Sequence, residues 1–202
     1  YVPQAGAGGR AEETRAARAV HLLESVTSEE AHRCGIQTVM HIAEDREAWP
    51  LLKDAGVVPA LVAVLKSDGM RVRQAALEPL DLLSHDDEIC VGIGEAGAVS
   101  PLVRLMREAQ GDVRLRATAL LSKLAWHWRS QRAVVAEGGL GPLVEMLRGE
   151  GGEEDAVQGQ LAAAATMRAL GCERSCLDAI AESGAPEVLA GLLLRGSREA
   201  GV

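Results

Sequence analysis

The chain has 202 residues, of which 48% are hydrophobic, 25% charged and only 2% aromatic, and its formal net charge is −8. This balance is typical of a folded domain. The negative charge argues against nucleic acid as the main ligand, because a basic face is needed to neutralise phosphates. Phe is absent, so the abundant Ala, Val and Leu favour thin helix-on-helix layers over one core built on large rings.

The cysteines and the apolar runs indicate a cytoplasmic protein, with a cytoskeletal or ciliary location also compatible. The four cysteines, Cys34, Cys90, Cys172 and Cys176, show no CxxC spacing and are too sparse for a secreted scaffold. We therefore expect reduced thiols. No apolar run is long enough to cross a bilayer, so no membrane insertion is expected. Residues 1–10 lack the basic-then-apolar order of a signal peptide.

Helical segments separated by glycines follow one another along the chain. The Gly- and Ala-rich residues 1–10 predict a flexible N-terminal stretch, and residues 11–26 predict a helix. After these, a segment recurs that opens with Gly and continues, after a proline, with an apolar pair. Its copies occupy residues 56–62, 97–103, 138–144 and 184–190. Their opening glycines lie 41, 41 and 46 residues apart, which indicates an internal repeat.

Each repeat predicts three helices. A short first helix, as at 89–95, ends at the glycine, which adopts the left-handed conformation without a Cβ penalty. Pro then lies in the first turn of the second helix, where its missing N–H does no harm. The third helix is longer, as at 70–84, and its small residue Ala76 lets neighbouring helices approach closely. Pro79 predicts a kink or a local break in this helix.

The repeats make residues 11–202 one segment. We expect a degenerate repeat, three fuller repeats and a partial one, at 11–55, 56–96, 97–137, 138–183 and 184–202. The repeat at 138–183 is five residues longer than its neighbours, and the extra residues fall in the Gly- and Glu-rich stretch 149–159. We predict an enlarged surface loop there, because insertions are tolerated in loops. The partial repeat is expected to end after its second helix, near Leu194.

The Gly-x-x-(x)-Pro-Leu-Val opening, the period of about 41 residues and the Ala-x-x-x-Leu-x-x-Leu third helix at 117–124 resemble the armadillo repeat. The resemblance extends from about residue 28 to the C-terminus, with residues 11–26 as a degenerate second helix. It implies an all-α, right-handed superhelical armadillo-type α-solenoid of about four three-helix repeats. Neither end carries the polar cap that a solenoid needs. We therefore expect a segment of a larger protein whose ends are covered by further repeats or other chains.

No catalytic or metal-binding constellation is apparent. Residues 92–97 match GxGxxG, but they fall at a helix end and a repeat junction rather than after a strand. Cys172 and Cys176 are one helical turn apart, and even with His127 they fall short of a four-ligand site. We expect no enzyme activity, no metal and no cofactor.

Trp126-His127-Trp128 follows a third helix, and two interpretations of it remain open. The rings could fill the turn between repeats. Alternatively, they could be an exposed aromatic anchor for a partner, since Trp is enriched at binding hot spots. The matching positions in the other repeats are Glu44, His85 and Cys172 for Trp126, and Arg46, Asp87 and Arg174 for Trp128. Packing common to all repeats therefore does not require the aromatic pair.

The armadillo resemblance implies a groove, lined by the third helices, that holds extended peptides. The partner-binding residues predicted in this groove and in the Trp turn are Arg33, Gln37, His41, Arg71, Gln74, Glu78, Lys123, Trp126 and Trp128. Nuclear-import adaptors of the family carry Trp and Asn four residues apart on successive third helices. Gln37, Glu78, Ala119 and Ala165 occupy the Trp positions here, and His41, Leu82, Lys123 and Ala169 the Asn positions. Import-signal binding is therefore disfavoured, and interleaved acidic residues argue against a long basic groove.

The sequence thus predicts a scaffold or adaptor that binds a protein or an extended peptide and does not bind nucleic acid. More narrowly, the parent protein could be one of the family members that join ankyrin with armadillo repeats or that are built into ciliary axonemes. The alternative is the substrate-recognition segment of a ubiquitin ligase, because armadillo repeats are often fused to such a domain.

Overall fold

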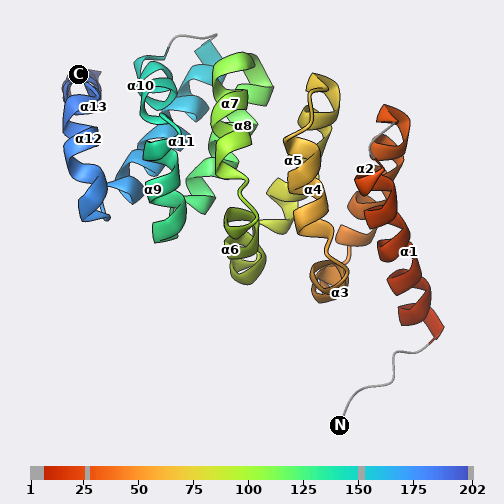
Figure 1. Ribbon diagram of the computed structural model, residues 1–202. Coiled ribbons are helices and arrows are strands. Elements are labelled where there is room, and N and C mark those ends of the chain that lie inside the picture. The colour runs from red at the N-terminus through yellow and green to blue at the C-terminus, as the bar shows by residue number, and fades with distance from the viewer. Residues whose placement is uncertain (1–6, 26–27, 150–152, 200–202) are drawn as a thin grey trace. The chain divides into compact units, whose positions relative to one another are not determined.

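The computed structural model describes residues 7–25, 28–149 and 153–199, and every regular element in these ranges is a helix (Figure 1). The chain divides into two compact units, Tyr1–Ala98 and Val99–Val202. In each unit a helix of 14 residues is preceded and followed by shorter helices.

The first unit contains six α-helices and one 3-10 helix among its described residues. These are α1 (Ala7–Glu24), α2 (Glu29–Ala43), η1 (Arg46–Ala48), α3 (Trp49–Asp54), α4 (Val57–Leu65), α5 (Met70–Leu83) and α6 (Asp87–Glu95). The long helices α2 and α5 pack against each other, and α4 packs on α5. The core lies between them and includes the fully buried Leu61 and Leu80.

The second unit repeats this arrangement. Its described elements are α7 (Val99–Glu108), α8 (Gly111–Leu124), α9 (Trp128–Ala136), α10 (Leu140–Arg148), α11 (Glu153–Leu170), η2 (Arg174–Cys176), α12 (Leu177–Glu182) and α13 (Ala185–Glu199). The long helices α8 and α11 pack together, while α7 packs on α8 and α10 on α11. Leu102 and Leu121 are fully buried here, and each lies one repeat of 41 residues after its counterpart, Leu61 or Leu80.

Four glycines set the junctions between short and medium helices. Gly56, Gly97, Gly138 and Gly184 have φ values of 78°, 82°, 69° and 79°. Side chains rarely adopt this left-handed conformation, and glycine adopts it without strain. The predicted glycine-ended first helix is therefore confirmed at all four junctions.

Three predicted boundaries are wrong. Helix α1 begins at Ala7, inside the stretch 1–10 that was expected to be flexible, and residues 1–6 lie outside the described ranges. Helix α5 is unbroken from Met70 to Leu83 with the buried Pro79 inside it, so the local break, one of the two alternatives predicted at Pro79, does not occur. Helix α13 continues to Glu199, beyond the expected end near Leu194. In each case local composition predicted an interruption, while the packed helix simply continues.

The predicted loop at 149–159 is also wrong over most of its length. Helix α10 ends at Arg148, its C-cap Gly149 has a φ of 76°, and α11 begins at Glu153; residues 150–152 are outside the described ranges. The insertion thus lengthens the third helix to 18 residues, against 14 in α8. Ala-rich sequence favours this extension. Gln160 also donates from Nε2 to the Leu147 carbonyl at 3.1 Å, and so satisfies a carbonyl at the end of α10.

In the described ranges no single helix is both long and apolar enough to cross a membrane, although two bent helix pairs would pass on length and composition alone.

Candidate protein-binding edge of the second unit

Two exposed tryptophans lie in the turn between α8 and α9. Helix α8 ends at Leu124 and α9 begins at Trp128, so Ala125, Trp126 and His127 form the connection and Trp128 opens the next helix. Trp126 is 56% exposed and Trp128 is 50% exposed. Rings that filled the turn would be buried, as Trp49 of the first unit is at 5%. Of the two interpretations of the Trp pair, the exposed one agrees with this geometry.

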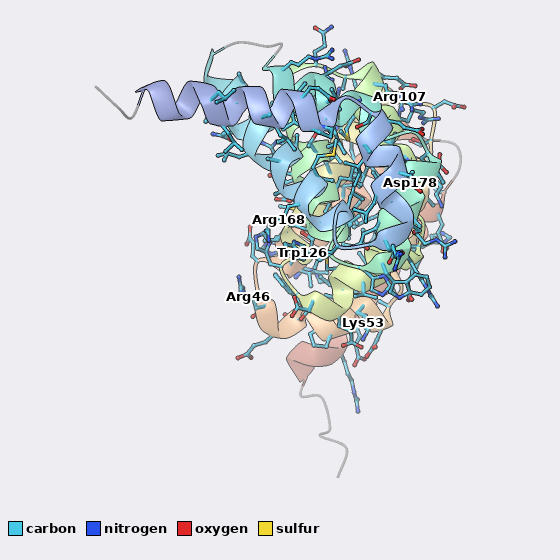
Figure 2. The ribbon with its side chains drawn as sticks, turned by 90° about the vertical axis from the view of Figure 1, so that its left-hand side faces the viewer. Arg46, Lys53, Arg107, Trp126, Arg168 and Asp178 are labelled. Carbon is cyan, nitrogen blue, oxygen red and sulfur yellow. The ribbon has the colours of Figure 1, made fainter. Side chains whose placement is uncertain are left out.

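An arginine guanidinium lies over each of the two rings. The Arg168 guanidinium, from the end of α11, lies 4.5 Å from the centre of the Trp126 ring, and Figure 2 shows these two labelled residues next to each other. The Arg129 guanidinium lies 5.2 Å from the Trp128 ring centre. The His127 and Trp128 ring centres are 6.0 Å apart, with the planes tilted by 32°. We call the surface formed by Trp126, His127, Trp128, Arg129 and Arg168 the tryptophan edge.

Helix α9 is held against α11 by a buried amide. Gln131 is 5% exposed, and its Nε2 donates to the Ala169 carbonyl at 3.1 Å. This buried hydrogen bond fixes how far α9 can slide along α11, because breaking it would leave a buried polar group without a partner. Since Ala169 follows Arg168 directly, the same bond places the Arg168 side chain beside the turn that carries Trp126.

The turn between α8 and α9 lacks the side-chain helix cap that the corresponding turns of the other repeats have. At the corresponding position Asp45, Asp86 and Glu173 each accept a hydrogen bond from a backbone N–H in the first turn of the next helix. His127 occupies this position before α9, and its side chain makes no capping bond. A capping side chain typically contributes about 0.5–2 kcal/mol. Helix stability alone would therefore favour Asp over His at position 127.

The positions of Trp126 and Trp128 are exposed throughout the chain. Their counterparts are polar or small and exposed in each case, namely Glu44, His85 and Cys172, and Arg46, Asp87 and Arg174. Two large rings at these exposed positions do not contribute to the helix packing that the repeats share. Exposed Trp side chains beside polar groups are typical of interface anchors.

Basic side chains surround the tryptophans. Lys123, Arg129 and Arg132 lie between residues 123 and 132, a stretch without any carboxylate. Across from them, Arg168 and Arg174 flank Glu173 at the end of α11 and the start of η2. Hydrogen bonds from the Ser175 hydroxyl and N–H lower the pKa of Glu173, and the charge of Arg132 adds to this effect. Glu173 therefore stays ionised and offsets only part of the positive charge.

A shallow polar pocket of about 270 Å³ lies in the first unit, between α3 and the start of α6. Arg46, Trp49, Lys53, His85 and Glu88 are among the residues that line it. Lys53 and Glu88 form an ion pair across it, and the hydrogen bond from this pair raises the pKa of Lys53. The pocket thus holds paired charges of both signs, and its aromatic residue is buried.

Comparison with solved structures decides the fold class. The chain superposes on an engineered protein with a TM-score of 0.72 at 28% identity, over 88% of this chain and 71% of the other. It superposes equally well, with a TM-score of 0.72 at 26% identity, on a computationally designed armadillo repeat protein for modular peptide recognition, over 87% and 73% of the two chains. The chain has the armadillo-repeat fold. The predicted all-α armadillo-type solenoid is thereby confirmed.

Sequence comparison adds one natural relative of this armadillo chain. No protein-family model matches the chain. A U-box domain-containing protein 11 from Arabidopsis thaliana is 33% identical over 84 residues, which are 41% of this chain. The match covers 14% of that protein's length, so the chain corresponds to a small part of it.

The predicted groove residues of the armadillo fold are distributed over both units. In the first unit Arg33, Gln37 and His41 are exposed on α2, and Arg71 and Glu78 are exposed on α5, the helix that packs against α2. Gln74 of α5 is half-buried, as is Lys123 of α8 in the second unit. His41 lies 3.6 Å from Glu44, one turn further along the chain. Solvent therefore reaches most of these side chains, and their role in binding remains a prediction.

Sequence reasoning missed the two arginines of the tryptophan edge. Arg129 directly follows Trp128, and its place beside the ring could have been proposed from adjacency. Arg168 is 42 residues away from Trp126, and its repeat counterparts are Ser122, Asp81 and Met40. This departure from the repeat pattern was a usable signal, but pairing it with Trp126 requires knowing which faces of α8 and α11 meet.

The motifs set aside earlier fit the repeat. Gly92 and Gly94 lie inside α6 and Gly97 forms the junction after it, where a nucleotide site would need a preceding strand. Cys172 is exposed and Cys176 is buried, and burial raises the pKa of the Cys176 thiol. In the part of the chain that the structure describes, no group of three or more His, Cys, Asp or Glu side chains could hold a metal ion.

Proposed function

We propose that this armadillo segment is a non-enzymatic scaffold that binds a partner protein, and that the tryptophan edge is its main contact surface. One observation carries the proposal: two half-exposed Trp rings occupy a turn where the other repeats place polar or small residues. Exposed aromatic side chains that are stacked by Arg lose little side-chain entropy on binding, because their orientation is already restricted. The designed neighbour made for peptide recognition supports a binding role for the fold.

The experiment is affinity capture with matched variants. The wild-type chain, the Trp126→Ala/Trp128→Ala double variant and Arg148→Ala are used as baits, and the captured proteins are quantified by mass spectrometry. Arg148 is a suitable control, because it is exposed at the end of α10, away from the turn and outside the third helices. We expect a set of proteins that the double variant loses and the control keeps. Identical capture by all three baits would refute the proposal.

A second candidate function rests on the Arabidopsis thaliana relative. The 33% identity over 84 residues to a U-box domain-containing protein favours the substrate-recognition segment of a ubiquitin ligase. The parent protein would then form ubiquitin chains with purified activating and conjugating enzymes, and would modify the partner that the tryptophan edge captures. If ubiquitin transfer is absent while capture is intact, the scaffold proposal stands alone.

We place the parent protein in the cytoplasm, including its cytoskeletal or ciliary structures, and propose an ankyrin–armadillo or axonemal context as its narrower setting. Fluorescence microscopy of the tagged full-length protein tests this placement. A nuclear or secreted distribution would contradict it.

A further inference from the structure

The tryptophan edge is basic as well as aromatic, and this combination constrains its partner. Arg129 and Arg168 supply one guanidinium to each ring. Lys123 and Arg132 lie within the same stretch of sequence, which contains no acidic residue. The chain as a whole carries a net charge of −8, so a cluster of cations at this turn runs against the overall composition.

Arg168 lies over an aromatic ring and still carries N–H donors. A guanidinium has five N–H groups, and they can form paired hydrogen bonds with a carboxylate. Among the described residues, no ion pair of Arg168 is found, and its guanidinium lies 4.5 Å from the Trp126 ring centre. The ring thus holds the cation in place for an acidic group that comes from outside.

The positive charge is a property of this turn and not of the armadillo fold. The corresponding turn after α2 in the first unit carries three carboxylates beside Arg46, and the one after α5 carries Asp86, Asp87 and Glu88. Asp45 and Asp86 cap the next helix in these turns, and Asp86 accepts from the Ile89 N–H at 2.9 Å. The second unit has instead placed cations and indoles at the same point of its backbone.

We propose, building on the scaffold function above, that the tryptophan edge binds an extended acidic peptide segment of the partner. One of its carboxylates pairs with Arg168, and an apolar side chain of the same segment packs against the exposed indoles of Trp126 and Trp128. The site lies at the turn that joins a long helix to the next short helix. It is therefore separate from the helix faces that would line a peptide groove.

Single-stranded nucleic acid is the competing ligand, since Arg and Trp also stack on bases. The acidic peptide is favoured because binding to phosphates requires an extended positive field, and the edge has Glu173 and Asp178 close in sequence to Arg168 and Arg174. The experiment below includes a nucleic-acid probe to separate these ligands.

Fluorescence anisotropy with defined probes tests the proposal. The probes are a short labelled peptide that repeats Asp-Glu-Leu-Ser, two matched peptides that repeat Asn-Gln-Leu-Ser and Lys-Arg-Leu-Ser, and single-stranded oligo-dT. We expect the acidic peptide to bind about fivefold more tightly than the neutral one at low salt, as one exposed charge pair at Arg168 would allow. The preference should shrink as salt is added. Equal affinity for the three peptides, no binding of any peptide, or tighter binding of oligo-dT would each overturn the proposal.

Charge-reversal variants locate the site. Arg129→Glu/Arg168→Glu should abolish the preference for the acidic peptide and raise the affinity for the basic one. The milder Arg129→Gln/Arg168→Gln pair repeats the test without introducing repulsion, and thermal melts verify that each variant is folded. Arg148→Glu is the matched control, because Arg148 is exposed at the far end of α10. If Arg148→Glu lowers the affinity for the acidic peptide as much as the edge variants do, the charge effect is general and the proposed site is wrong.

Failure of this inference is distinguishable from failure of the scaffold function. If the Trp126→Ala/Trp128→Ala variant loses its captured proteins while the peptides show no charge preference, the edge binds a partner of another chemistry. If capture is unchanged by the Trp substitutions, the scaffold proposal itself fails.

Discussion

The turn after α8 in the second unit differs in chemistry from the two turns that follow the long helices of the first unit. In the first unit they are acidic, and Asp45 and Asp86 each cap the next helix. In the second unit the turn after α8 presents Trp126 and Trp128 to solvent and leaves its helix without a side-chain cap at His127. The backbone course is the same, so the difference lies in the side chains alone. A repeat protein can thus keep one packing scheme and place a binding surface where a single repeat departs from it.

The largest expected effect comes from breaking the packing that both units share. Leu80→Asp in the first unit or Leu121→Asp in the second should remove about 4–5 kcal/mol or more of stability, because each buries an unpaired charge at a fully buried position. Circular dichroism during thermal unfolding measures this. Leu161→Asp is the control, since Leu161 is 66% exposed. A cooperative transition retained at the wild-type temperature in either core variant would show that the repeat register is wrong.

The tryptophans provide the sharpest contrast between the units. Trp49→Ala should destabilise the chain by about 3–5 kcal/mol, because Trp49 is buried and its Nε1 donates to the Ala43 carbonyl at 2.8 Å. Trp126→Ala and Trp128→Ala should each change stability by only about 0.5 kcal/mol, as is usual for surface positions. Urea unfolding of the three variants compares them directly. Comparable losses for all three would mean that the edge rings serve packing.

Much of the fold could be predicted from the sequence because its strongest constraints are local. The left-handed conformation at the end of a helix favours glycine, so the recurring glycines in the sequence, such as Gly56 and Gly97, indicate where helices end. The helical span of the insertion was missed for the opposite reason. Gly and Glu suggested a loop, whereas Gln160 and the alanines after it extend α11 over most of that stretch.

The candidate site was only half predictable. The Trp pair stood out as a departure from the repeat, but its exposure could not be deduced, since an indole suits a packed turn and a binding surface equally well. Arg168 could not be assigned to Trp126, because that contact depends on how α8 and α11 meet and on the buried bond from Gln131 to Ala169. Contacts across helices are set by tertiary packing, which a linear pattern does not encode.

Removing the helix cap in the first unit should lower stability, and adding one at the turn before α9 in the second unit should raise it. Asp86→Ala is expected to lose about 1 kcal/mol, and His127→Asp to gain a similar amount by capping α9. Both effects are measurable by urea unfolding. His127→Asp should also weaken partner capture, because it adds a carboxylate to the proposed acidic-peptide site. A destabilised His127→Asp variant would argue against the capping comparison.

The smallest expected effect is on pH dependence. The pKa of Glu173 should lie below its ordinary value of about 4.5, chiefly because the Ser175 hydroxyl donates to it. Because the folded pKa is lowered, Glu173 contributes stability above its unfolded pKa, and this contribution is lost as the pH falls through the folded value. NMR titration of the Glu173 carboxyl carbon measures the pKa, and Ser175→Ala should raise it. An unchanged pKa in Ser175→Ala would remove the assigned cause.

The most direct test of the central claim is calorimetric titration of a captured partner into the wild-type chain and into Trp126→Ala/Trp128→Ala. If the tryptophan edge is the binding surface, the double variant should bind at least about tenfold more weakly while it melts like the wild type. Equal affinities for two equally folded proteins would contradict the account.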